Sequence, residues 1–129
     1  MADQQDVERL AKKLPNVVAT EGHYGFGVVV RGKPKGFVSV WLERVDPKRA
    51  RVPNPGVLVI PVADLEVKEE LLAADPSVYF TEPHYDGYRA VLVRLEAIDV
   101  GELAELLTEA WLCTAPPALA REWEGRLRP

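Results

Sequence analysis

The chain has 129 residues and a mass of 14.3 kDa, a size that predicts one domain able to bury a core of its own. Its one cysteine, Cys113, excludes an intrachain disulfide framework and favours a reducing compartment. We see no leader peptide and no apolar run long enough to cross a bilayer, so we expect a cytoplasmic protein with no membrane partner.

The net charge of −4 disfavours a tight, non-specific polyanion binder, but the charges are unevenly distributed along the chain. Residues 1–64 carry ten Lys and Arg against seven Asp and Glu, whereas residues 65–129 carry six against thirteen. Between residues 31 and 51, seven basic side chains outnumber two acidic ones. This local excess of positive charge is the electrostatic feature that could attract a nucleic acid.

The first predicted element is a short amphipathic helix, because apolar residues recur at helical spacing from Val7 to Leu14 and Pro15 follows. Two runs rich in β-branched and aromatic residues come next, at 26–31 and 37–43. They are separated by a five-residue loop with glycine at each end, which predicts an antiparallel hairpin with its loop at 32–36.

In the second run, the alternation of a β-strand is expected to place Phe37 and Trp41 on the same face. The proline-containing stretch 44–56 is predicted to be a loop with basic side chains, and 57–60 a short buried strand. Asp64 is then a suitable N-cap for a second helix, since its carboxylate can accept a free backbone amide.

A second hairpin is predicted over residues 79–95. Its turn is expected at Asp86-Gly87, because these residue types tolerate the positive φ that tight hairpin turns require. Pro83 lacks an amide hydrogen, which favours a sheet edge for the outgoing strand. The return strand, 90–95, is almost entirely apolar and is expected inside the sheet.

The strongest helical pattern follows Asp99, which forms a capping-box-like pair with Glu102 and begins an apolar stripe that runs to Trp111. A short final helix is predicted around residues 119–123. Strand runs that are joined by hairpins and followed by helices predict an α+β fold, with helices packed on one face of an antiparallel sheet.

The segment DPSVYFTEPHYDGYRAVLVRL, with the DVGELAELLTEAW helix and APPAL after it, resembles the MmcQ/YjbR family of small bacterial proteins. Upstream, LPNVVATEGHYGFGVVVRGK is similar to the opening helix, Leu-Pro break and first hairpin of that family. The resemblance covers roughly Val7 to Trp123. It implies a CyaY-like (frataxin-like) fold and a "double wing" DNA-binding role, in which hairpin loops act as wings.

The resemblance and the basic loops together suggest DNA as a weakly bound partner, through loop-tip cations that could reach phosphates on either side of a groove. The alternative is that these side chains serve solubility and block edge-to-edge strand pairing. The candidate DNA-binding residues are Arg31, Lys33, Lys35, Lys48, Arg49 and Arg51.

The second hypothesis is a small-molecule or protein-interaction module that uses the aromatic hairpin face. Its candidate pocket residues are His23, Trp41, His84, Tyr85 and Tyr88, whose alternative role is structural packing. No spacing indicates a nucleophile–base pair, a metal-ligand pair or a phosphate loop, so we expect no cofactor, no metal and no evident enzyme chemistry. Cys113, near a helix end, is expected to be a buried and inert thiol.

Overall fold

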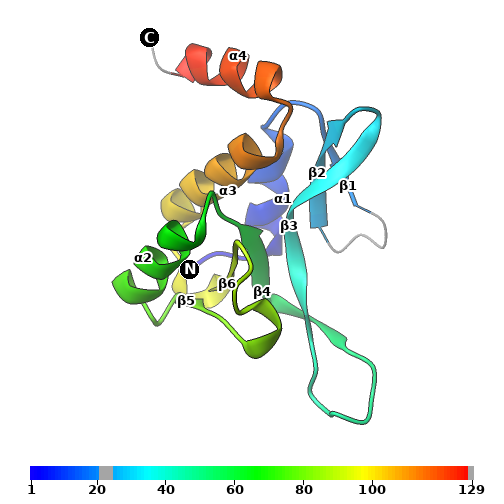
Figure 1. Cartoon of the computed structure of the whole chain (residues 1–129), viewed down its shortest axis with the longest axis vertical. Helices are drawn as coiled ribbons and strands as arrows, with labels where there is room; N and C mark the ends of the chain where they lie inside the picture. Colours follow the sequence, from blue (N-terminus) through cyan, green and yellow to red (C-terminus); the bar gives the residue numbers. More distant parts are fainter. Residues whose placement is uncertain (21–24, 128–129) are drawn as a thin grey trace.

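The computed structural model describes residues 1–20 and 25–127, the last three by their backbone alone (Figure 1). Its helices and strands, in chain order, are α1 (Gln4–Lys12), β1 (Val17–Ala19), β2 (Gly25–Val30), β3 (Lys33–Glu43), β4 (Val52–Pro61), α2 (Leu65–Ala74), β5 (Tyr79–Phe80), β6 (Ala90–Arg94), α3 (Val100–Thr114) and α4 (Pro117–Leu127). Two short 3-10 helices, η2 (Pro83–Tyr85) and η3 (Leu95–Ala97), lie on either side of β6 in the chain.

The strands form one six-stranded antiparallel sheet in the order β1-β2-β3-β4-β6-β5. Helix α3 packs along β3 and β4, and α1 packs against α3 and β1 (Figure 1). This arrangement confirms the prediction of an α+β fold in which an antiparallel sheet carries its helices on one face. The structure adds a strand, β1, that the apolar pattern did not predict.

The predicted N-caps of α2 and α3 are present. The carboxylate of Asp64 accepts a hydrogen bond from the amide of Val67 at 2.9 Å, and that of Asp99 accepts one from the amide of Gly101 at 3.1 Å. Each bond satisfies an amide that has no partner within its helix. Both helices therefore begin where the sequence predicts.

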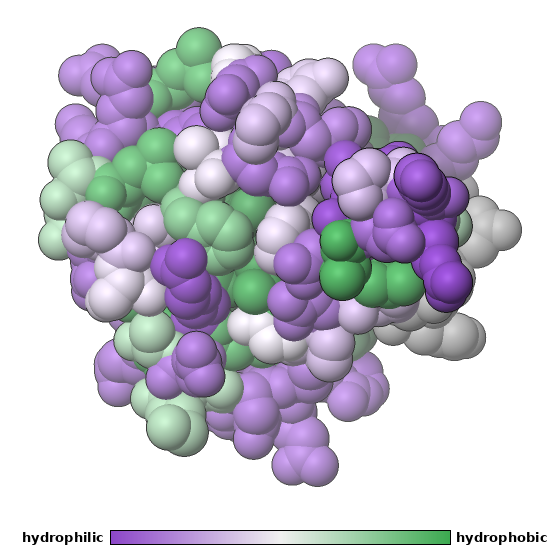
Figure 2. All heavy atoms as spheres, turned by 90° about the horizontal axis from the view of Figure 1, so that it is seen from below, coloured by the Kyte–Doolittle hydropathy of each residue, from purple (hydrophilic) through white to green (hydrophobic). Residues whose placement is uncertain are grey.

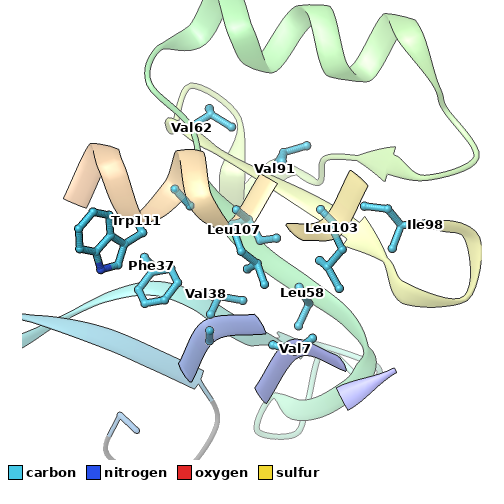
Figure 3. Packing of buried hydrophobic residues seen from close by; sticks show 14 of the residues in the cluster. Val7, Phe37, Val38, Leu58, Val62, Val91, Ile98, Leu103, Leu107 and Trp111 are labelled. Carbon is cyan, nitrogen blue, oxygen red and sulfur yellow. The ribbon is translucent and has the colours of Figure 1, made fainter. Parts of the chain in front are cut away.

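The main core lies between the helices and the sheet (Figure 3). Val7 of α1, Leu58 of β4 and Leu107 of α3 are almost completely buried there. Trp111 is also fully buried, and its indole N–H donates a hydrogen bond to the carbonyl of Pro15 at 3.0 Å. This bond satisfies the polar atom of the largest core side chain and ties α3 to the end of the first helix.

A smaller cluster occupies the opposite face of the sheet. It consists of Trp41, Val57 and Leu92, with Phe80 and Tyr85 packed against them. Alternation along the strands explains the separation, since the neighbours of these residues in β4, β5 and β6 point into the main core. The aromatic hairpin therefore has an apolar floor that is separate from the helical core.

The register of β2 and β3 shifts after Phe26 and leaves Phe37 as the extra residue of a β-bulge. Phe37 and Val38 consequently both lie in the main core, whereas Trp41 lies in the cluster on the other face. The expectation that Phe37 and Trp41 share a face is wrong, because the bulge shifts the alternation by one residue.

The turn between β2 and β3 is shorter than predicted. Val30 pairs with Lys33, so Arg31 and Gly32 form the whole turn. Their φ angles are 52° and 80°, and two positive values are typical of a type I′ hairpin turn. The predicted loop over 32–36 is therefore wrong, because its last four residues belong to β3.

Strands β3 and β4 continue below the rest of the sheet as a paired hairpin, which we call the arm (residues 42–53; Figure 1). The predicted loop over 44–56 is wrong at its end, because β4 begins at Val52. Pro53 and Pro55 lie within this strand, next to an irregular register in which missing amide hydrogens are tolerated. Figure 2 shows the tip of the arm at the right, where strongly hydrophilic residues stand beside hydrophobic ones.

The second hairpin has the predicted strand placement but a different connection. β5 is an edge strand and β6 lies inside the sheet, as expected. The connecting segment, which we call the aromatic loop, spans residues 81–89 and contains the helix η2. The predicted two-residue turn at Asp86-Gly87 is wrong, although Gly87 has the positive φ of 81° that was expected. Pro83 begins the 3-10 turn, and the strand pairing has already ended at Phe80.

Candidate functional site

Three aromatic rings of the aromatic loop contact one another. The ring centroids of His84 and Tyr85 are 4.9 Å apart at 86°, and Tyr88 lies 6.2 Å from each of them. Tyr88 is 58% exposed, whereas Tyr85 is half-buried against the cluster on the far face of the sheet. The structure thus brings together three of the five residues predicted to line a pocket.

Lys68 of α2 fixes the conformation of this loop. It is 5% exposed, and its ammonium group donates to the carbonyl of Tyr85 at 2.6 Å and to that of Tyr88 at 3.0 Å. Sequence analysis missed this residue. Lys68 shares a helical stripe with Leu71 and Leu72, and a lysine on an apolar stripe needs a buried partner.

A groove of about 660 Å³, which we call the cationic groove, opens beside the aromatic loop. Two basic side chains line it, Lys35 from β3 and Arg89 from the end of the loop, and no Asp or Glu does so among the described residues. The full lining is Lys35, Gly36, Pro61, Val62, Ala63, His84, Tyr85, Tyr88, Arg89, Ala90, Cys113 and Thr114. Donors and rings therefore converge here without an opposing carboxylate in the wall.

The phenol of Tyr85 stays protonated over a wide pH range. Burial raises its pKa, the carboxylate of Glu82 raises it further, and the guanidinium of Arg51 lowers it. A protonated phenol can donate a hydrogen bond to an anionic ligand. Tyr85 packs against the apolar cluster and also lines the groove, so its phenol is available to a ligand there.

Trp41 does not line the groove. Its ring packs edge-on against Phe80 at 5.7 Å, and its indole N–H donates to the carboxylate of Glu82 at 3.4 Å. It belongs to the same cluster as Tyr85 and supports the aromatic loop there. His23, the remaining residue of the predicted pocket, lies outside the described residues.

The predicted basic residues do not form one patch. Arg31, Lys33 and Lys35 lie at the start of β3, whereas Lys48, Arg49 and Arg51 lie in or beside the loop of the arm, at its other end. The two groups are at the upper and lower ends of the strand (Figure 1). The expectation that these cations converge is wrong, because an 11-residue strand separates them by about 33 Å.

Within the lower group, two of the three cations have acidic partners. Arg49 lies 3.6 Å from Asp46, and Arg51 lies 3.5 Å from Glu82 while also donating to the carbonyl of Leu42. Arg51 is thus a structural residue at the base of the arm. Lys48 is exposed at its tip.

Helices α2 and α3 border a second groove, of about 310 Å³, which we call the acidic groove. Tyr79 is buried at its base, where burial and the neighbouring carboxylate of Glu102 raise the pKa of the phenol well above its usual range. The full lining is Pro61, Val62, Ala63, Val67, Leu71, Tyr79, Glu102, Glu105, Leu106, Glu109 and Cys113.

Cys113 lies in the wall shared by the two grooves. It is exposed, so the expectation of a buried thiol is wrong: the last turn of α3 presents it to the surface. Partial burial and the carboxylate of Glu109 raise its pKa, and the guanidinium of Arg89 lowers it. A raised pKa keeps the group a thiol at neutral pH, the less reactive form.

Residues 1–20 and 25–127 contain no group of three or more His, Cys, Asp or Glu placed to hold a metal ion. Over the same ranges, none of the helices combines the length and the apolar character that crossing a bilayer requires.

No protein-family model matches the chain. It is 52% identical over 69 residues to the uncharacterized proteins Rv2570 of Mycobacterium tuberculosis (strain ATCC 25618 / H37Rv) and Mb2600 of Mycobacterium bovis (strain ATCC BAA-935 / AF2122/97). The matched segment is 54% of this chain, and the chain spans about half the length of these relatives, 54% of each.

The fold is similar to a crystal structure of the Deinococcus radiodurans protein DR2400, which carries the domain DUF419. The TM-score is 0.68 at 22% sequence identity, over 96% of this chain and 89% of the other. The likeness shows a shared fold. DUF419 is the MmcQ/YjbR-type fold family, so the fold agrees with the resemblance found in the sequence.

Proposed function

We propose that the chain is a binding protein of the MmcQ/YjbR type whose cationic groove takes a small anionic ligand with a planar ring, such as a mononucleotide. One observation carries this proposal. Lys35 and Arg89, which are far apart in the sequence, line the same groove as the ring of Tyr88, and no carboxylate opposes them among the described lining residues. Cations recognise an anionic group, and an exposed aromatic ring offers a stacking surface.

The side chains of the groove have separate roles in this proposal. Arg89 can grip two oxygens of a phosphate or carboxylate with its planar guanidinium, whereas Lys35 supplies a point charge. His84 and Tyr88 offer ring edges and faces for a base or another planar group. Because Lys68 already holds the loop carbonyls, little conformational entropy is lost when a ligand binds.

The test is a titration of the protein with adenosine monophosphate, followed by calorimetry and by the amide NMR shifts of the aromatic loop. The substitutions Lys35→Gln and Arg89→Gln are each expected to weaken binding by roughly 10-fold, since each removes a charge-assisted contact. Lys33→Gln is the matched control, because Lys33 is an exposed lysine of the same strand that does not line the groove. Equal affinity in all three variants, or no binding by the unsubstituted protein, would reject the proposal.

DNA binding is a second candidate, and the spacing of the two basic groups supports it. The ends of β3 are about 33 Å apart by its residue count, close to the ~34 Å of one turn of B-DNA. Two hairpin ends at this distance could contact phosphates one helical turn apart, in agreement with the double-wing role that the resemblance implies.

Fluorescence anisotropy with a duplex at low salt tests this candidate. Replacing Arg31 and Lys33 with Ala, or Lys48 and Arg49 with Ala, should weaken binding and reduce its salt dependence. Replacing Lys12 and Lys13, two exposed cations at the end of α1, is the control and should have little effect. A duplex that stays unbound at low salt, or equal losses in all variants, would exclude the two-wing mode.

A further inference from the structure

The acidic groove joins an apolar floor to a negatively charged rim. Val67 and Leu71 of α2 and Leu106 of α3 form part of the floor. Glu105 and Glu109, one turn apart on α3, are exposed at the rim beside Glu102. The groove therefore favours an occupant that carries both apolar and cationic side chains.

The two helices that border this groove carry an excess of negative charge. Helices α2 and α3 together carry six Glu and one basic residue, Lys68, whose ammonium group is buried under the aromatic loop. Among the described residues, none of these six carboxylates belongs to an ion pair. The surface of α2 and α3 is thus negatively charged around the apolar floor of the groove.

The arm has the complementary surface. Arg44, Lys48 and Arg49 are exposed there, whereas the two acidic residues of the arm, Glu43 and Asp46, are half-buried. Val45 is 70% exposed, and Leu42 and Val52 on the same arm are 42% and 46% exposed. Three of the large apolar side chains exposed in the described residues thus lie on this arm among cations.

We infer that the arm of one copy docks in the acidic groove of a second copy of this chain. Apolar side chains of the arm would cover Val67, Leu71 and Leu106, while its cations would face the glutamates of the rim. The arm extends below the sheet, away from α2 and α3, so it does not point toward the groove of its own copy (Figure 1). The contact joins two different surfaces, so it closes as a pair or a ring or continues as a chain of copies.

Sedimentation velocity at micromolar to millimolar protein concentration tests this inference. Wild-type protein should associate reversibly at low salt and dissociate as salt screens the charges. One variant reverses the charge of the groove rim by Glu105→Lys with Glu109→Lys. Another reverses the charge of the arm by Lys48→Glu with Arg49→Glu. Each alone should lower the association constant at least about 10-fold, because like charges then face each other.

Mixing the two charge-reversed variants is the decisive measurement. Opposite charges face each other again in the mixture, so association should return, and only in the mixture. Glu96→Lys is a control charge reversal at an exposed glutamate outside the groove and should associate like wild type. All the altered side chains are exposed, and circular dichroism will establish that each variant is folded.

A wild-type protein that remains monomeric across this range would overturn the inference and leave the groove to a different partner. Reversed variants that associate like wild type would do the same, as would a mixture that stays monomeric. Adenosine monophosphate binding is expected to be unchanged in the arm variant and in Glu96→Lys, because none of these residues lines the cationic groove.

Discussion

The ammonium group of Lys68 lies 2.6 Å from the backbone oxygen of Tyr85, inside the protein and without a carboxylate partner among the described residues. It also reaches the carbonyl of Tyr88. Removing this buried ammonium group is expected to be costly, because both carbonyl oxygens would then lack their hydrogen-bond donor. This one side chain therefore connects the stability of α2 to the shape of the candidate binding loop.

Replacing Lys68 with Met should lower the free energy of unfolding by about 1–3 kcal/mol, because the methionine fills the space but cannot donate to the carbonyls. Urea denaturation measures this change. Glu69→Gln, at the next and exposed position of the helix, should stay within about 0.5 kcal/mol of wild type. Faster amide exchange in the aromatic loop should accompany the loss in Lys68→Met, and unchanged stability would contradict the anchoring role.

Gly25→Ala is expected to be severely destabilising, by more than about 2 kcal/mol, because its Cβ would lie 2.1 Å from the carbonyl oxygen of Val38. The neighbouring strand would have to move for a methyl group to fit. Gly36→Ala is the matched control, since no atom lies within 4 Å of a Cβ built there. Thermal unfolding of the two variants should separate clearly, and equal midpoints would show that the strands relax around Gly25.

Arg31→Asn should stabilise the protein by about 0.5–1 kcal/mol, because asparagine tolerates the positive φ of this type I′ turn better than arginine does. Arg31→Val should act in the opposite direction, since a β-branched side chain is unfavourable at φ 52°. Denaturant midpoints test both. A stabilising valine would show that the turn changes type when the side chain changes.

The thiol of Cys113 should react slowly with iodoacetamide near neutral pH although it is exposed, because its raised pKa keeps the thiolate fraction low. The rate should rise with pH as the thiolate forms. Glu109→Gln removes a carboxylate that raises the pKa and should speed alkylation, whereas Arg89→Gln removes a cation that lowers it and should slow alkylation. Unchanged rates in both variants would show that burial alone sets the pKa, and changes of the reverse sign would contradict the two charge effects.

Local patterns in the sequence predicted the helices and the α+β class because these features depend on spacing that is visible within one segment. The N-caps at Asp64 and Asp99 and the internal position of β6 are examples. The errors came from pairing. The bulge at Phe37 and the two-residue turn at Arg31-Gly32 depend on the partner strand, and the pattern of a single strand does not contain that information.

The candidate site shows the same division. His84, Tyr85 and Tyr88 were predicted together because they are adjacent in sequence, and they do lie together. Lys35 and Arg89 meet in one groove only through the sheet, so their partnership had no local signal. The prediction that the two basic groups converge did not take account of the length of β3, which is set by its pairing with β4.

The tight turn at one end of β3 and the arm at the other end are expected to tolerate insertions and deletions to different extents. The arm becomes shorter or longer when paired residues are removed from it or added to it. Such changes leave the buried side chains of the helical face in place. Relatives with this fold can therefore differ in reach while keeping the same interior, and insertions and deletions are expected to accumulate in this hairpin.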